Sequence, residues 1–167
     1  MRPLKLRAVD EITVAPSAIA LPHNPANVHA VTELETTRID VAYIGACTGA
    51  KLDDLCAAAR VLGGKRIAPG VQLLIAPASV QDAAEAEREG VLGQLLAAGA
   101  TLLPSACGAC AGYGSAIADG ATVISSTARN FKGRMGADSA QVYLGSPYTV
   151  AASALRGAIS DARELLS

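Results

Sequence analysis

The chain has few aromatic residues, with no tryptophan, one phenylalanine and four tyrosines among 167 residues. It also lacks an apolar run approaching the roughly 18 residues that suggest a membrane span, and residues 1–11 lack the long apolar stretch of a secretory leader. The formal net charge is −1 with no basic cluster, so the charge gives no indication of nucleic-acid binding. These absences predict a soluble, cytoplasmic protein of single-domain size.

What the chain has is small apolar side chains. Hydrophobic residues make up 51% of the sequence, and 16 glycines accompany an abundance of alanine. A core of useful size is therefore possible, and we expect it to rest on close packing of small groups. Four cysteines are present, but a chain so rich in apolar segments does not resemble a small disulfide-stabilised scaffold.

Two parts of the chain differ in pattern. Residues 1–38 are punctuated by Pro3, Pro16, Pro22 and Pro25 and are predicted to form an irregular leading segment, with a short strand near residues 12–14. Residues 39–167 are regular and are predicted to form one α/β domain.

Strands and helices are expected to alternate in this second part. The predicted strands cover residues 39–46, 71–76, 101–103, 121–126 and 143–144. The predicted helices cover residues 52–62, 80–98 with a bend near Gly90, and 147–166 with Ser146 as N-cap. This alternation predicts a three-layer αβα fold around a mostly parallel sheet.

Ligands of open parallel sheets bind beyond the carboxyl ends of the strands. Three segments with unusual chemistry follow predicted strands: the turn at Cys47, residues 105–112, and residues 127–134. We therefore expect these segments to lie together at one edge of the sheet.

The cysteines indicate a metal site. Cys107 and Cys110 lie in a C-G-A-C turn whose glycine permits a tight backbone, and folding can bring Cys47 to them from the end of another strand. Three protein ligands leave one metal position open, whereas closed structural sites normally use four ligands. An iron–sulfur cube held by three cysteines has one iron free to bind substrate.

Two other readings of the cysteines stay open. A C-x-x-C pair is also half of a zinc site, for which His23, His29 and Cys56 are the further candidate ligands. It is also the pattern of a thioredoxin-like redox pair, although that motif normally follows the first strand. Cys56 falls on the apolar face of its predicted helix, where a packing role is expected.

Three ordered motifs resemble the aconitase superfamily. Y-I-G-A-C-T at residues 43–48 resembles its I-G-S-C-T segment, C-G-A-C at 107–110 its C-G-P-C segment, and R-N-F-K-G-R at 129–134 its R-N-F-x-G-R segment. L-P-H-N-P at 21–25 is similar to the stretch leading into the same domain. The likeness runs from about residue 10 to the end and is greatest to 3-isopropylmalate dehydratase large subunits and homoaconitase-like hydro-lyases.

The resemblance implies an aconitase-type iron–sulfur domain with a [4Fe-4S] cluster on Cys47, Cys107 and Cys110. It implies a hydro-lyase acting on a small hydroxy di- or tricarboxylic acid, with Arg129 and Arg134 binding carboxylates. The chemistry is consistent, because a Lewis-acidic iron stabilises a departing hydroxide and an arginine fork fits a carboxylate. The alternative for the arginines is a place on a solvated loop.

Three positions depart from the family pattern. Gly49 stands where the family commonly has asparagine after C-T, Ala128 where it has asparagine before R-N-F, and Ala109 where it has proline inside C-x-x-C. Loss of two amides removes donors that could orient substrate or tune the cluster sulfurs. The departures therefore bear on the identity of the substrate and, less strongly, on activity.

The resemblance covers one domain of a longer family. It implies that the remaining large-subunit domains and a swivel-domain subunit, which carries the serine that removes the proton, are partners of this chain. We expect no significant hydro-lyase activity from this chain alone and identify no catalytic residue in it. A divergent, non-catalytic binding or sensor module is the alternative.

Overall fold

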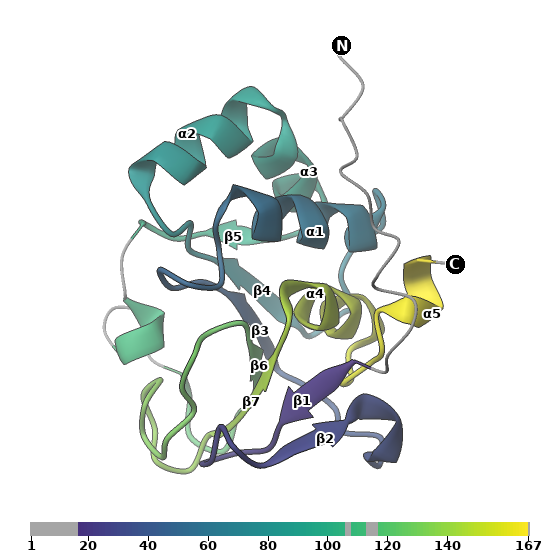
Figure 1. Cartoon of the computed structure of the whole chain (residues 1–167), viewed down its shortest axis with the longest axis vertical. Helices are drawn as coiled ribbons and strands as arrows, with labels where there is room; N and C mark the ends of the chain where they lie inside the picture. Colours follow the sequence, from purple (N-terminus) through teal and green to yellow (C-terminus); the bar gives the residue numbers. More distant parts are fainter. Residues whose placement is uncertain (1–16, 106–107, 113–116, 167) are drawn as a thin grey trace.

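The computed structural model describes residues 17–105, 108–112 and 117–166. Its strands form one sheet with helices and loops packed against it (Figure 1). The strands are β1 (Ala18–Ala20), β2 (Val28–Ala30), β3 (Val41–Ile44), β4 (Gln72–Ile75), β5 (Thr101–Leu102), β6 (Thr122–Ser125) and β7 (Gln141–Gly145). The helices are η1 (Val31–Glu33), α1 (Leu52–Leu62), α2 (Val80–Arg88), α3 (Val91–Ala97), η2 (Ala109–Ala111), α4 (Pro147–Arg156) and α5 (Arg163–Leu166).

The sheet is mostly parallel, as predicted. The described strands follow the order β2-β1-β7-β6-β3-β4-β5, and every pair from β7 to β5 is parallel. β1 pairs antiparallel with β7, and β2 pairs antiparallel with β1. The carboxyl ends of the parallel strands therefore meet at one edge, which is the edge expected to carry the functional loops.

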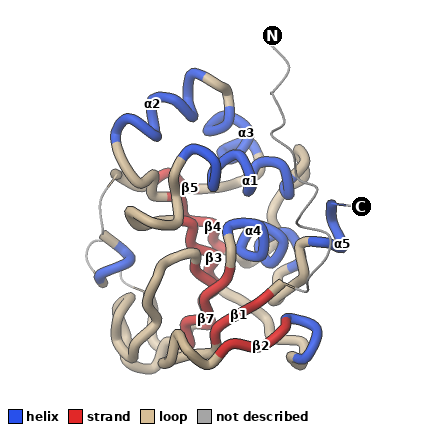
Figure 2. Tube along the Cα trace, in the orientation of Figure 1, coloured by secondary structure: helices blue, strands red, loops and turns tan. Residues whose placement is uncertain are grey.

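Alternation along the central strand β3 separates two cores. Ala42 and Ile44 pack with α1, α3 and α4 on one face of the sheet. Val41 and Tyr43 pack on the other face, where the covering layer consists of η2 and loops (Figure 2). The α/β prediction is confirmed, with long helices on one face and mainly loops on the other.

The helix layer is built from small residues. α1 packs against α4, and half of the buried residues of each helix are alanine: Ala57, Ala58 and Ala59 in α1, and Ala151, Ala152 and Ala154 in α4. Small side chains let helix backbones approach closely, which is the packing expected from the composition.

Two of the predicted helices match the structure closely. α1 has the predicted bounds and ends at Gly63, which has φ 52° and donates its N–H to the Ala59 carbonyl. The helix predicted over residues 80–98 is broken at the expected glycine into α2 and α3, because Gly90 has φ 77°.

The last predicted helix is too long. Ser146 caps α4 as expected, since its Oγ accepts a hydrogen bond from the Thr149 N–H at 3.2 Å. The helix ends at Arg156, because Gly157 takes a left-handed conformation with φ 74°. The chain then runs without helix to α5, so residues 147–166 form two helices instead of one.

The leading segment contributes strands that the sequence did not predict. β1 and β2 form a hairpin that extends the sheet beyond β7. β7 is also longer than the predicted strand at residues 143–144. The strand predicted near residues 12–14 lies outside the described residues, and the domain boundary between residues 38 and 39 stays a prediction.

An ionic clasp joins the beginning of the described chain to its end. Asp161 accepts hydrogen bonds from the backbone N–H and the hydroxyl of Ser17, at 3.3 and 2.9 Å. It also accepts from the Arg163 guanidinium, with the shortest N–O distance 2.7 Å. The clasp thereby ties the residue that precedes β1 to the residues that precede α5.

Candidate functional site

The loops that follow β3, β5 and β6 gather on one side of the molecule (Figure 1). β3 and β6 are neighbours, with Tyr43 paired to Ser125, so the chain leaves both strands at the same level. The segment after β5 stays close as well, because the Ser105 hydroxyl donates to the Ser79 carbonyl beyond the end of β4 at 3.2 Å. This is the carboxyl edge at which the sequence placed the site.

Cys47 lies at the exposed tip of the loop after β3. It is a free thiol. Ala46 before it has φ 70°, a left-handed conformation that is uncommon for a residue with a side chain. Ala46 is nevertheless buried, in the core on the loop-covered face of the sheet. The backbone therefore turns its small side chain inward while Cys47 is accessible to solvent.

Cys110 lies in the short helix η2 and is 6% exposed. It is a free thiol in the same core as Ala46, the neighbour of Cys47. Cys107 lies outside the described residues, so the three-cysteine ligand set stays a prediction. Within the described residues, no three His, Cys, Asp or Glu side chains form a group that could hold a metal ion.

Of the other candidate ligands, Cys56 and His29 lie elsewhere, whereas the His23 backbone bonds the arginine loop. Cys56 is half-buried against the helix-side core, on the opposite face of the sheet from Cys110. Burial, followed by the charges of Glu89 and Asp53, raises the pKa of its thiol. His29 contacts Asn27 Oδ1 at 3.0 Å and Glu33 at 3.6 Å beside β2. The position of Cys56 against the helix-side core agrees with the packing role expected for it.

The two arginines differ in exposure. Arg129 is exposed, whereas Arg134 is half-buried. The Arg134 N–H donates to the Phe131 carbonyl at 2.9 Å, which closes a turn between the two arginines. Among the described residues, the buried Nε of Arg134 has no hydrogen-bond partner. The guanidinium of Arg134 therefore has a donor to offer to an anion.

The arginine turn lies directly beside the turn that carries Cys110. An added Cβ at Gly112 would be 3.3 Å from the Gly136 nitrogen and 3.7 Å from the Arg134 carbonyl oxygen. The main chain two residues after Cys110 therefore approaches the main chain of Arg134. The structure thus brings the second and third sequence motifs together.

Asn130 holds the arginine loop to the sheet. It is fully buried, and its Nδ2 donates to the carbonyls of Leu21 and Val142 at 2.7 and 2.9 Å. The His23 N–H also donates to its backbone carbonyl at 3.1 Å. Asn130 thus joins β1 and β7 where their pairing stops. The side chain of Phe131, by contrast, is 52% exposed.

Ser126 is a functional candidate that the sequence did not reveal. It lies between β6 and Arg129, and its hydroxyl contacts the loop of Cys47 through Gly45 and Gly49. A hydroxyl residue just before the R-N-F motif was the available signal, but the partner of that hydroxyl depends on the folded path of another loop.

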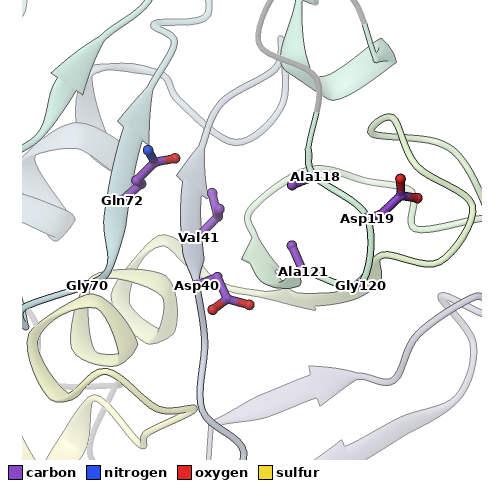
Figure 3. Close-up of a pocket in the computed structure, with 8 residues that line it drawn as sticks. All are labelled: Asp40, Val41, Gly70, Gln72, Ala118, Asp119, Gly120 and Ala121. Atoms are coloured by element: carbon purple, nitrogen blue, oxygen red, sulfur yellow. The ribbon is translucent and has the colours of Figure 1, made fainter.

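A hollow lies at the amino end of the parallel strands, opposite the carboxyl edge (Figure 3). Its volume is about 430 Å³, and Asp40, Gln72 and Asp119 line it near the amino ends of β3 and β4. Both carboxylates already have partners, since Asp40 accepts from the Thr122 N–H at 2.8 Å and Asp119 from the Ser139 hydroxyl at 2.9 Å. The hollow is open and polar and lies away from the cysteines.

No described helix is both long and apolar enough to cross a membrane.

Comparison with known proteins agrees with this geometry. The chain is 43% identical over 163 residues to the 3-isopropylmalate dehydratase large subunit of Mycolicibacterium smegmatis, which covers 97% of this chain and 39% of that protein. It is 45% identical over 148 residues to the homoaconitase large subunit of Thermus thermophilus, covering 88% of this chain and 35% of that protein. The chain thus spans well under half the length of these relatives.

A family profile provides the assignment. The profile of the Aconitase family (aconitate hydratase) matches residues 8–157, which contain all three motifs. The chain belongs to the aconitase family.

Proposed function

We propose that this chain is the cluster-bearing part of a [4Fe-4S] hydro-lyase that acts on a small hydroxy di- or tricarboxylic acid. The observation that carries the proposal is the gathering of Cys47, the Cys110 turn and the Arg134 turn at the carboxyl edge of an aconitase-family sheet. The relatives named 3-isopropylmalate dehydratase and homoaconitase large subunit support this substrate class.

The described thiols suit an iron–sulfur cluster. Cys47 and Cys110 are free, and the residues around them belong to one core. Thiolates are the ligands that such clusters prefer. Cys47 is exposed, whereas Cys110 forms part of an apolar wall. Cys107 is proposed as the third ligand.

The arginines are proposed to bind the acid. When bound, the cluster supplies a Lewis-acidic iron for the substrate hydroxyl. Arg129 extends into solvent from the loop that Asn130 anchors, and Arg134 follows in the same turn. Both would pair with carboxylates, because the planar guanidinium fork matches carboxylate geometry.

The three residues that depart from the family pattern lie at this same edge of the sheet. Ala109 is 2% exposed and packs in the core beside Cys110, while Ala128 is exposed next to Arg129. Gly49 lies against Ser126. Two of these positions lack an amide that could orient a substrate, so we propose that the preferred acid differs from that of the asparagine-bearing relatives.

Turnover is proposed to need partners. The remaining large-subunit domains and a swivel-domain subunit would supply the proton-removing group, and the chain alone would have no significant activity. A cytoplasmic location is proposed with this function. The second candidate is a binding or sensor module, which the missing amides at positions 49 and 128 favour.

Cluster reconstitution tests the proposal. The purified chain is loaded with iron and sulfide without oxygen, and both are counted per chain together with the visible absorption spectrum. We expect roughly four of each, with loss of the cluster in Cys47→Ala. Cys56→Ala is the matched control and is expected to retain the cluster, because Cys56 packs on the opposite face.

Three outcomes would contradict the cluster. Zinc bound in place of iron would support a zinc protein, and a reversible disulfide without metal would support a redox pair. A chain that takes up no metal would support a binding module. A cluster that binds no hydroxy acid in the assembled complex would favour a sensor over an enzyme.

A further inference from the structure

We propose that Ser126 is a positioning residue for Cys47. Its hydroxyl closes the loop that carries the cysteine and fixes that loop to the strand leading to Arg129. The inference rests on the proposed function, because it concerns a cysteine assigned there as a cluster ligand.

The contacts of Ser126 enclose Cys47 from both sides. The Ser126 Oγ accepts a hydrogen bond from the Gly45 N–H at 3.1 Å and donates one to the Gly49 carbonyl at 2.8 Å. The Ser126 N–H also donates to the Tyr43 carbonyl at 3.0 Å, which continues the ladder between β3 and β6. One side chain thus bonds the loop two residues before Cys47 and two residues after it.

The fit at Gly49 leaves no room for a side chain. A Cβ added to Gly49 would overlap the backbone carbonyl oxygen of Ser126, and it would lie 2.8 Å from Oγ. Backbone cannot move aside as the end of a flexible side chain can. Gly49 therefore lies directly against the main chain of Ser126, and a side chain at position 49 would force this part of the loop to shift.

The backbone between the two contacts is strained. Ala46 has φ 70°, and such conformations persist where the surroundings over-determine them. The ends of the loop are fixed by Ser126, so the loop cannot easily relax the left-handed turn. We infer that the hydroxyl holds the conformation that leaves the Cys47 thiol exposed.

Ser139 offers a matched control. Its hydroxyl accepts from the Gly120 N–H at 2.9 Å and donates to Asp119 Oδ1 at 2.9 Å. This is the same pattern of one accepted and one donated hydrogen bond, near the hollow at the opposite end of the sheet. Ser139→Ala removes as many hydrogen bonds as Ser126→Ala without touching the loop of Cys47.

The test combines amide hydrogen exchange with iron retention in the full chain. In Ser126→Ala, residues 45–50 are expected to exchange at least about tenfold faster, because the Gly45 N–H loses its acceptor and the loop its closure. Release of iron to a chelator from the reconstituted chain is expected to accelerate by a similar factor. Ser126→Thr, which keeps the hydroxyl, is expected to restore both rates.

The control separates loop closure from general loosening. Ser139→Ala is expected to speed exchange around Gly120 and to leave residues 45–50 and iron release unchanged. If Ser126→Ala does not fold, Gly49→Ala tests the same contact and is expected to accelerate both rates. Unchanged exchange at 45–50 in the folded Ser126→Ala variant, or equal iron loss in Ser139→Ala, would overturn the proposal.

Failure of the cluster assignment gives a different result. If the wild-type chain takes up no iron, the proposed function fails, while the exchange measurement on the metal-free chain still decides whether Ser126 holds the loop of Cys47.

Discussion

The two faces of the sheet are stabilised in different ways. On one face, regular helices bury alanine, leucine and valine in a continuous apolar core. On the other face, the layer is formed mainly by η2 and loops. At the carboxyl edge of the sheet, single side chains such as Ser126 and Asn130 bond distant main-chain groups. The cysteine Cys110 and the loops of both arginines belong to this second face.

The helix-covered face mainly stabilises the fold, whereas the loops carry the candidate functional residues. Helices satisfy their own backbone hydrogen bonds, so their side chains are free to fill a core. Loops do not satisfy all of their own backbone hydrogen bonds, so side chains must bond the remaining backbone groups. That arrangement allows the main chain to take conformations such as the left-handed turn at Ala46, which no helix could present. Four measurements test this difference between the two faces.

Leu55→Ala is expected to cause the largest loss of stability. Leu55 is fully buried in the helix-side core, and the cavity left by its truncation should lower the free energy of unfolding by about 2–5 kcal/mol. Urea unfolding followed by circular dichroism measures the change. Iron content of the folded fraction should stay at the wild-type level, and a selective loss of iron would contradict the separation of the two faces.

Asn130→Ala should cause the next largest loss of stability, and it should loosen the arginine loop. It leaves the carbonyls of Leu21 and Val142 without their donor, at an expected cost of about 1–3 kcal/mol. Hydrogen exchange should rise around residues 127–134 and 21–23. The exposed Asn24, whose Oδ1 accepts from the Ala26 N–H, provides the control, and Asn24→Ala should change stability by less. Equal effects of the two variants would count against Asn130 as the anchor.

The clasp at Asp161 is expected to make a smaller, pH-dependent contribution to the free energy of unfolding. Burial raises the pKa of Asp161, but hydrogen bonds from Arg163 and Ser17 outweigh burial and lower the pKa from 3.8 to about 2. The ionised form is therefore the one stabilised by folding. This stabilisation is complete above pH 3.8 and is lost as the pH falls through 2.

The clasp is worth at most about 2 kcal/mol by this linkage. In Asp161→Asn, the free energy of unfolding should depend less on pH between 5 and 2, roughly the interval over which the carboxyl titrates. Urea titrations at several pH values measure the slope. A slope equal to that of the wild type would show that the clasp makes no such contribution.

Arg129→Ala should have the smallest effect on folding. Its side chain is exposed, and substitutions at such positions usually change stability by less than about 0.5 kcal/mol. Binding of a dicarboxylic acid to the assembled complex, measured by calorimetry, should nevertheless weaken at least about tenfold. Lys132→Ala on the same exposed loop is the charge-matched control. Equal weakening by both variants would indicate general electrostatic attraction in place of a specific contact.

The helix face was the more predictable of the two. The bounds of α1 followed from its apolar spacing and from Gly63, and the break in the next helix followed from Gly90. The last helix was predicted too long, because nothing in the sequence distinguishes Gly157 as a terminator from a glycine tolerated within a helix.

The loop face was predictable in location but not in contacts. Strand order and direction place the loops after β3 and β6 at one edge, and the sequence suffices for that inference. The bonds of Asn130 to Leu21 and Val142 depend on where two other segments pass in space, which local pattern does not encode. The cysteine ligand set and the roles of Arg129 and Arg134 stay predictions.

The alanine-rich contact between α1 and α4 has a consequence for mutational studies. Alanine is already the smallest side chain that a helix favours, so a conventional alanine scan leaves the alanine positions of this contact unchanged. Damage there can arise only by enlargement, because a bulkier residue at Ala58 or Ala152, both fully buried, must push the helices apart. Sequence drift in this family member should therefore be limited by crowding at Ala58 of α1 and Ala152 of α4, whereas at Leu55, also in α1, it should be limited by loss of volume.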